Sequence, residues 1–447
     1  MALLTAPAPG TRPAAGAAPI AGTGGNPAVA PAGRFAARAR STPGRLTGLM
    51  LLLVLVGLLA GTAAVVGVAQ RSARVEAVRG QSGRLAVQAQ LLYRSLSDAD
   101  ATAASAFLSG GVETPALRQQ YQADIAAASA ALAEVTAGGT GDRTAVARIT
   151  AQLPVYAGLV ETARSYNRVG LPLGAAYLRE ASGLMRAELL PAAENIYGSQ
   201  TDQLRSDRSD GAGFPWLAVA LLLATLVGLV LGQRYLTRRT NRLLNPGLVV
   251  ATGAVLIMFL WLTVSWVSVQ SHLDTSRRTG SERVDRLAKI RIAALTARAD
   301  EALTLVARGS GGDFETDYGK RMKTIGDGST GLLGSGDADT RAALAGVGTR
   351  VNAWNEAHKQ VRDLDKNKGD YPGAVQLATG DGAAATAFTA LDKDLADGIA
   401  AANATFDDQA RSAAGGFTLA VPGLVVLTLL MLAGVVAGLQ RRIAEYR

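Results

Sequence analysis

Four uncharged apolar runs constrain this chain most, because each is long enough to cross a lipid bilayer. A membrane-spanning helix needs roughly 20 apolar residues. The runs are Leu46–Ala69, Phe214–Gly232, Gly247–Val269 and Phe417–Leu439. A helix satisfies the backbone hydrogen bonds of such a run without water. The sequence therefore predicts an all-α membrane protein with four transmembrane helices.

The excess basic charge is confined to three short segments that flank these runs. Residues 1–45 carry five Arg and no acid, 233–245 carry four Arg and no acid, and 440–447 carry three Arg and one Glu. The two long polar regions are nearly neutral, with 14 bases and 14 acids in 70–212 and 19 bases and 21 acids in 271–416. Short basic segments stay in the cytoplasm. We therefore expect a multi-pass plasma-membrane protein with both termini cytoplasmic.

This charge pattern also decides between kinds of partner. The net charge of +9 would suit nucleic acid if it lay on a folded surface, but it lies beside the spans instead. We therefore expect no nucleic-acid partner. Basic residues at a membrane surface attract anionic lipid headgroups, so membrane lipids are expected partners.

The predicted organisation has nine parts, each defined by its hydropathy and charge. They are a disordered basic cytoplasmic tail (1–45), a first span (46–69), a first extracytoplasmic bundle (70–212), a second span (213–232), a cytoplasmic elbow (233–245), a third span (246–270), a second extracytoplasmic bundle (271–416), a fourth span (417–439) and a cytoplasmic tail (440–447). The tail 1–45 has a second interpretation, as a docking segment for a cytoplasmic partner.

Small and apolar residues recur at alternating steps of four and three along 78–106, a period typical of packed helices. Breaks rich in Gly then divide the rest of the first long region. They predict helices over 70–108, 115–136, 143–169 and 175–207, the last kinked at Pro191. Four helices with short connections favour an antiparallel four-helix bundle.

The second long region repeats this plan. Asp300 precedes Gly311 by eleven residues, as Asp100 precedes Gly111, and Trp354 has the place that Tyr156 has in the first region. A repeat of this size indicates duplicated domains. We therefore predict a tandem pair of extracytoplasmic four-helix bundles.

The spans contain small residues at four-residue spacing, in Gly57-xxx-Gly61, Ala224-xxx-Gly228-xxx-Gly232 and Gly434-xxx-Gly438. Such spacing permits close approach of helices in membranes. The alternative interpretation is compositional, because the chain contains 51 Gly.

The residues that catalysis and metal binding require are scarce. The chain has no Cys and two His, His272 and His358, and it contains neither a P-loop nor a His-Glu-x-x-His motif. A catalytic zinc site usually needs three protein ligands. We expect His358 to be a surface residue. The sequence predicts no cofactor, no metal site and no enzymatic activity.

Two acidic pairs near the ends of the predicted first helices are candidate outer sensory positions: Asp98 with Asp100, and Asp300 with Glu301. Paired carboxylates could also perform acid–base chemistry. The alternative interpretation is that they are solvated or form salt bridges inside the bundles.

Four arginines of the elbow, Arg234, Arg238, Arg239 and Arg242, are the candidate contacts for a cytoplasmic partner or for lipid. The elbow joins the two halves of the chain. It is too short for an active site, so any output must come from another protein.

The architecture resembles two known kinds of protein. The first helices end in Ser-Asp-Ala-Asp-Ala (97–101) or Ala-Asp-Glu-Ala (299–302), and each leads to a glycine turn, at 110–111 and 309–312. These regions look like the bundle sensors of bacterial chemoreceptors. The duplicated form with four spans and a basic Pro/Ala-rich tail resembles the actinobacterial GlnX-type membrane proteins.

The resemblance implies a non-enzymatic relay. It implies an extracytoplasmic solute-binding lipoprotein for amino acids and a cytoplasmic soluble serine/threonine protein kinase as partners. It supplies no ligand residues. The sequence leaves open whether the chain is instead an accessory or scaffold subunit of a transport or envelope complex, and whether it forms a homodimer.

Overall fold

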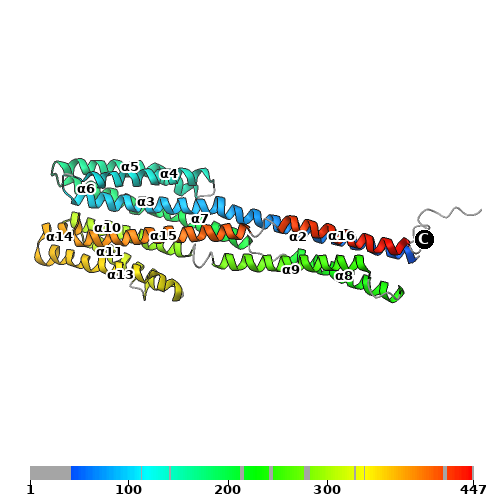
Figure 1. Cartoon of the computed structure of the whole chain (residues 1–447). Helices are drawn as coiled ribbons and strands as arrows, with labels where there is room; N and C mark the ends of the chain where they lie inside the picture. The colour runs from blue at the N-terminus through cyan, green and yellow to red at the C-terminus, as the bar shows by residue number, and fades with distance from the viewer. Residues whose placement is uncertain are drawn as a thin grey trace, which may run out of the picture.

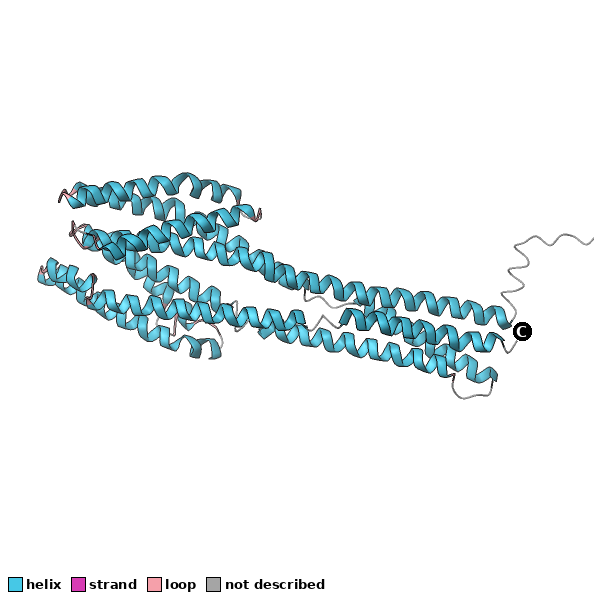
Figure 2. Cartoon of the chain, turned by 45° about the horizontal axis from the view of Figure 1, so that its top comes forward, coloured by secondary structure: helices cyan, strands magenta, loops and turns pink. Residues whose placement is uncertain are grey.

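The computed structural model describes residues 42–111, 113–139, 142–211, 216–240, 245–275, 282–326, 329–336, 338–415 and 420–444. All regular secondary structure in these ranges is helical, with no strand. The molecule is elongated, with two helical units at one end and the apolar helices at the other (Figures 1 and 2). The predicted all-α fold is confirmed for the described residues. The predicted tail 1–45 lies almost wholly outside them.

The helix of the first span continues directly into the first helical unit. Together α2, a π-helical turn η1 and α3 form one helix from Thr42 to Leu108, roughly 100 Å long at 1.5 Å per residue. The other helices of this unit pack against α3 or against one another. In chain order the elements are α2 (Thr42–Ala77), η1 (Val78–Ser82), α3 (Gly83–Leu108), α4 (Pro115–Ala137), α5 (Arg143–Arg168), α6 (Leu173–Leu184), η2 (Met185–Leu189) and α7 (Leu190–Gly211).

Local signals explain where these helices begin. Thr114 accepts a hydrogen bond from the backbone N–H of Leu117 and is followed by Pro115 at the first helical position. Asp142 caps α5 by accepting bonds from Thr144 and Ala145. Both are ordinary N-cap arrangements that satisfy otherwise free N–H groups.

The two π-helical turns of this unit fall where the sequence predicts weakness. The turn η1 contains Gly80 and ends just before Gly83. The turn η2 ends two residues before Pro191, whose ring lacks an N–H and would collide with a regular helix. The fourth predicted helix is therefore continuous through α6, η2 and α7, with the proline accommodated by the wider turn.

The second helical unit has a similar long first helix but shorter and more numerous pieces after it. Its elements are α10 (Glu282–Val306), α11 (Gly312–Ile325), α12 (Gly331–Gly334), α13 (Ala338–Arg362), η4 (Asp363–Lys368), α14 (Tyr371–Ala378) and α15 (Ala383–Gly415).

The two units pack against each other through their first helices, α3 and α10. Their buried apolar side chains form one continuous cluster that includes Leu92 and Leu96 from the first unit and Leu303 from the second. Figure 1 shows α3 and α10 lying along the middle of the paired units, with α5 and α13 on opposite outer sides. A displacement of α3 would therefore change the packing of α10, and the reverse.

Four helices are long and apolar enough to cross a membrane, at Leu46–Gln70, Trp216–Arg238, Pro246–Val267 and Ala420–Arg441. They belong to α2, α8 (Trp216–Thr240), α9 (Pro246–Thr275) and α16 (Ala420–Ala444). Helix α2 packs against both α8 and α16, and α16 also packs against α9. Their buried side chains form a second apolar cluster, separate from that of the helical units.

Close approach in this second cluster depends on glycine. A Cβ placed on Gly61 would lie 2.3 Å from Thr428 Cγ2, and one on Gly57 would lie 2.7 Å from Met431 Cε. A Cβ on Gly434 would lie 2.7 Å from the carbonyl oxygen of Gly247. At each of these positions a Cβ would require neighbouring atoms to move, so the helices approach closely at the glycines through which the spans were predicted to pack.

The elbow is partly an extension of α8. Arg234 and Arg238 are exposed near the end of this helix, whereas the side chain of Arg239 and all of Arg242 lie outside the described residues. At its far end, Asn245 is buried, accepts from Gly247 N and donates to Gly438 O at 2.8 Å. This amide ties the start of α9 to α16.

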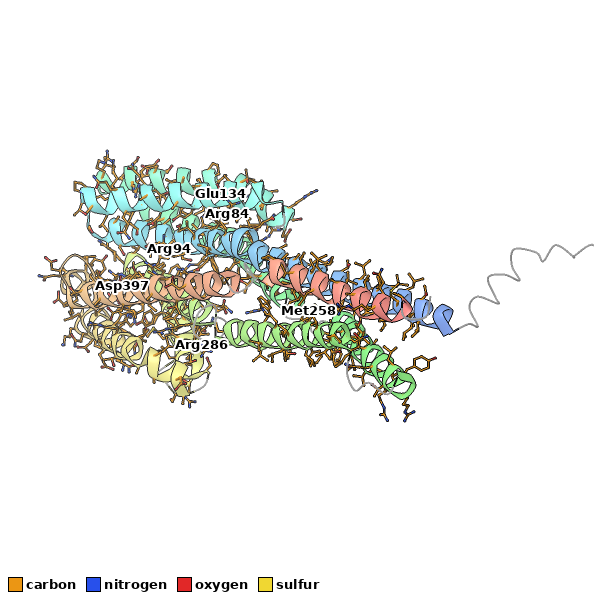
Figure 3. All side chains as sticks on the ribbon, turned by 45° about the vertical axis from the view of Figure 1, so that its right-hand side comes forward. Arg84, Arg94, Glu134, Met258, Arg286 and Asp397 are labelled. Carbon is orange, nitrogen blue, oxygen red and sulfur yellow. The ribbon has the colours of Figure 1, made fainter. Side chains whose placement is uncertain are left out.

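Charged side chains cover the helical units. The labelled pair Arg84 and Glu134 lies on the first unit and Asp397 on the second, whereas Met258 lies among the apolar helices (Figure 3). The Arg84–Glu134 ion pair is 3.9 Å long and both side chains are more than half exposed, so it adds little stability. The charges that matter for a mechanism are those buried inside.

Candidate functional site: a buried polar junction between the two units

The four predicted sensory acids are all buried, on the two helices that join the units. Asp98 and Asp100 lie on α3, and Asp300 and Glu301 lie on α10; none is more than 7% exposed. Buried carboxylates require partners, because an unpaired buried charge is costly. Their partners define the candidate site.

Asp98 contacts two polar side chains of the first unit. Gln120 Nε2 donates to its Oδ1 at 3.3 Å, and Arg94 lies 3.9 Å away. Burial, followed by the nearby Asp392 carboxylate, raises the pKa of Asp98. Burial also raises the pKa of the neighbouring Asp124 to about 7.

Asp100 lies deeper and is held mainly by neutral groups. Ser182 Oγ donates to its carboxylate at 2.6–2.7 Å, and the Tyr156 hydroxyl approaches Oδ1 at 3.4 Å. Burial raises the pKa of Asp100, while Arg186 and the two hydroxyl groups oppose that rise. The protonated form is therefore favoured more than in water.

Arg186 connects Asp100 to the second unit. It leaves the π-helical turn η2, lies 4.0 Å from Asp100 Oδ2 and pairs closely with Asp300 Oδ1. Its guanidinium also lies 5.4 Å from the ring centre of Phe314 on α11. The two acids that the repeat makes equivalent thus approach one arginine.

Sequence reasoning missed Arg186, because nothing near it in the chain is acidic at a helical spacing that would draw attention to it. The signal that would have found it is the pair of equivalent acids, which needs one shared cation if the first helices pack together. Burial raises the pKa of Asp300 to about 6, and Arg186 opposes that rise.

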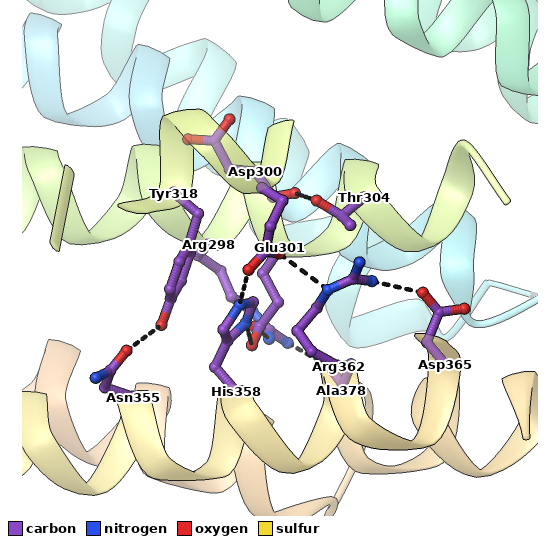
Figure 4. Close-up of polar contacts among 11 residues, drawn as sticks. Arg298, Asp300, Glu301, Thr304, Tyr318, Asn355, His358, Arg362, Asp365 and Ala378 are labelled. Atoms are coloured by element: carbon purple, nitrogen blue, oxygen red, sulfur yellow. Dashed lines mark hydrogen bonds and ion pairs between the residues drawn. The ribbon is translucent and has the colours of Figure 1, made fainter. Parts of the chain in front are cut away.

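Adjacent acids on α10 point in opposite directions (Figure 4). Asp300 faces the first unit, whereas Glu301 faces the interior of the second. Glu301 pairs with Arg298, which also donates to the carbonyl oxygen of Ala378. One turn of helix therefore carries both the contact between the units and the polar core of the second.

His358 lies at the centre of that polar core. Its Nδ1 is 3.0 Å from Glu301 Oε1, and its Nε2 is 3.3 Å from Glu315 Oε1. Arg362 lies 3.0 Å from Glu315. Burial lowers the pKa of His358, but the two carboxylates outweigh burial and the net pKa is raised. Both ring nitrogens are then positioned to donate.

The expectation that His358 is a surface residue was wrong, because its side chain is only 3% exposed. Its immediate sequence, Glu356-Ala-His-Lys-Gln, is polar and suggests solvent. The carboxylates that make burial tolerable come from α10 and α11, far away in the chain. The exposed neighbours Glu356 and Lys359 pair with each other instead.

Aromatic rings enclose this histidine. Tyr318 stacks on the imidazole with ring centres 3.7 Å apart and meets Trp354 edge-on at 5.6 Å. Trp354 is fully buried, as is Tyr156 at the corresponding position of the first unit. The two units therefore bury a large aromatic ring at corresponding sequence positions but surround it differently.

The arrangement supports coupling between helices more than chemistry. Each charged group of the network is engaged by other side chains. No group of three or more His, Asp or Glu side chains suited to holding a metal ion occurs in the described part of the chain. The contacts of this network join α3, α6, η2 and α10 around Arg186, and α10, α11 and α13 around His358.

Residues 74–209 match a family model described as an actinobacterial sensor domain. The matched range covers the end of α2 and most of the first helical unit, including Asp98, Asp100 and Arg186. No curated protein and no solved structure matches the chain. The first unit is therefore similar to a sensor domain.

Proposed function

We propose that this protein is a non-enzymatic transmembrane signal relay. It would pass the state of an extracytoplasmic amino-acid-binding lipoprotein to a cytoplasmic serine/threonine protein kinase. The sensor-domain similarity of residues 74–209 supports a signalling role. The lipoprotein, the kinase and the orientation with both termini inside come from the resemblance and the charge pattern given above.

One observation carries the proposal: a single helix runs from the first candidate span into the junction between the units. Helix α2 continues through η1 into α3, which carries Asp98 and Asp100. A small displacement or rotation of this helix outside would be transmitted to its packing against α8 and α16. Shifts of this kind are an established means of switching.

Site-specific crosslinking in living cells tests the two partners. A photoreactive residue in place of the exposed Val155 on α5 should capture the lipoprotein, and one in place of Arg238 on α8 should capture the kinase. Capture of both partners from one side of the membrane, or of neither, would overturn the proposal.

A reversible lock tests the transmission. The chain has no cysteine, so a Gly61→Cys/Thr428→Cys pair would be the only thiols, and its Cβ positions are close enough for a disulfide after a small adjustment. Oxidation should abolish the response of kinase phosphorylation to the amino acid, and reduction should restore it. A response that persists in the oxidised protein would contradict transmission through α2. If solute uptake changes and phosphorylation does not, the chain is instead a transport scaffold.

A further inference from the structure

A cleft of about 340 Å³ lies between the two helical units, beside the buried junction. It is lined by α3 and α7 of the first unit and by α10, α11 and α12 of the second. This volume is within the range of small-molecule sites, roughly 300–1,000 Å³. A ligand in it would touch both units at once.

One end of the cleft is already satisfied by the protein itself. Tyr197 donates to Asp285 Oδ1 at 2.6 Å, and Lys289 pairs with Asp285 Oδ2 at 3.0 Å. Arg205 pairs with Asp202 at 2.9 Å. A charged ligand gains little at this end, because its groups would have to displace these contacts.

The other end presents two opposite charges that the protein leaves open. Glu194 on α7 and Arg321 on α11 are exposed, and neither forms a hydrogen bond or ion pair with another described residue. Tyr93 on α3 lies with them in the lining. Burial, followed by the Glu194 carboxylate, raises the pKa of Tyr93 to about 12, while Arg321 opposes that rise. Both charged groups therefore act on the same hydroxyl.

Hydroxyl groups complete this open end. Thr296 on α10 and Thr324 on α11 line the cleft with Tyr93; both threonine hydroxyls donate to carbonyl oxygens of their own helices, so they offer a ligand acceptors. A carboxylate from one unit and a guanidinium from the other suit a ligand that carries an ammonium and an acidic group. A ligand with one charge would leave either Glu194 or Arg321 unpaired.

We infer that this cleft is a binding site for a small zwitterion, whose cationic group pairs with Glu194 and whose anionic group pairs with Arg321. The inference rests on the proposed relay, since it names an input that acts directly on the junction. Arg321 also supports the negative charge of Asp300, the partner of Arg186. A ligand anion on Arg321 weakens that support, and the bound ligand holds the two units in one relative position.

Direct binding to the full-length protein in lipid nanodiscs tests the site by calorimetry. The probes are the twenty protein amino acids and a series of increasing charge separation: glycine, β-alanine, γ-aminobutyrate and 6-aminohexanoate. Butylamine and butyrate are the single-charge controls. At least one zwitterion should bind saturably, and both single-charge compounds should bind at least about tenfold more weakly, a loss of about 1.4 kcal/mol.

Matched variants then locate the binding. Glu194→Gln and Arg321→Gln should each weaken binding of that zwitterion by about tenfold or more. Glu180→Gln on α6 and Lys323→Gln on α11 remove exposed charges outside the cleft and should leave binding unchanged. All four positions are exposed, so the fold should tolerate each change.

Three results would overturn the inference: no zwitterion binding saturably at millimolar concentration, equal binding of the single-charge compounds, or wild-type affinity in both cleft variants. These failures are distinct from failure of the relay. Crosslinking through Val155 and Arg238 and the disulfide lock would still succeed if the relay responds to a protein partner alone.

Discussion

The two helical units place an acid at the same point of their first helix but stabilise their interiors by different means. Asp100 and Asp300 both approach Arg186. One residue further on, the first unit has buried Ala101 where the second has buried Glu301. The first unit therefore surrounds its acid with the hydroxyl groups of Ser182 and Tyr156 beside Arg186, whereas the second contains an ion network built on His358.

This difference shifts the pKa values of buried acids in different directions. In the first unit, burial raises the pKa values of Asp98, Asp100 and Asp124, so their protonated forms are favoured by folding. In the second, burial opposes ionisation of Glu301, but Arg298 and His358 outweigh it and its pKa is lowered. Asp300 of the second unit, whose pKa burial raises to about 6, behaves like the acids of the first unit, so only the ion network around His358 sets the second unit apart.

Removing the charge of Glu301 should have the largest effect. Glu301→Gln keeps the shape but leaves Arg298 and His358 without their shared carboxylate, and breaking a buried ion pair costs about 3–5 kcal/mol. Chemical denaturation can be followed by the fluorescence of Trp354 after the other three tryptophans are replaced by Phe.

The matched control is Glu356→Gln, which removes an exposed carboxylate from α13, the helix that also carries His358. Its pair with Lys359 is more than half exposed, so the loss should stay below about 1 kcal/mol. A similar loss for both variants would show that the second unit does not depend on its buried ions.

Removing the hydroxyl of Ser182 should have an intermediate effect, confined to the first unit. Ser182→Ala deprives buried Asp100 of its shortest hydrogen bond, which for a charged acceptor is worth about 1.5–3 kcal/mol. Hydrogen exchange of peptides from α3 and α6 should accelerate, while α13 should be unchanged.

Ser165→Ala is the control for this change, because the exposed Ser165 hydroxyl bonds only to the carbonyl oxygen of Glu161. It should leave exchange in α3 unaltered. Equal protection of α3 in both variants would mean that Asp100 is satisfied without Ser182.

The contrast between the units shows which structural features could be predicted from the sequence. Glycine and proline breaks predicted the starts of α4 and α5 at Pro115 and Arg143, because those signals are local. The apolar runs likewise predicted the candidate spans. The interior of the second unit was not predictable in this way. Glu301 and His358 meet only because the fold of the second unit brings side chains of α10 and α13 together, and their separate surroundings look like solvated helix surfaces.

The change of the second unit's stability with pH should be smaller than the effect of Ser182→Ala, and it depends on His358. Its pKa is raised on folding, so its contribution is fully present below the unfolded value of about 6.5 and is lost as pH rises through the folded value. Glu301 and Glu315 have lowered pKa values, so their contributions are present above about 4.5 and are lost as pH falls through the folded values.

The unfolding midpoint reported by Trp354 should therefore fall on going from mildly acidic to alkaline pH. His358→Gln should flatten that fall, whereas exchange of the first unit should keep its own pH dependence. An unchanged slope in His358→Gln would assign the response to another group.

The smallest effect is expected from Tyr156→Phe. The hydroxyl lies 3.4 Å from Asp100 Oδ1, a long contact beside the much shorter one from Ser182, so its removal should cost no more than about 1 kcal/mol.

The same change should raise the pKa of Asp100 further, because this contact opposes the rise caused by burial. Infrared spectroscopy of the buried carboxyl can follow that shift, with Asp100→Asn to assign the band. A loss as large as that of Ser182→Ala would show that Tyr156 stabilises Asp100 as strongly as Ser182 does. Trp354 would then differ from Tyr156 in function, because its indole N–H has no acceptor among the described residues.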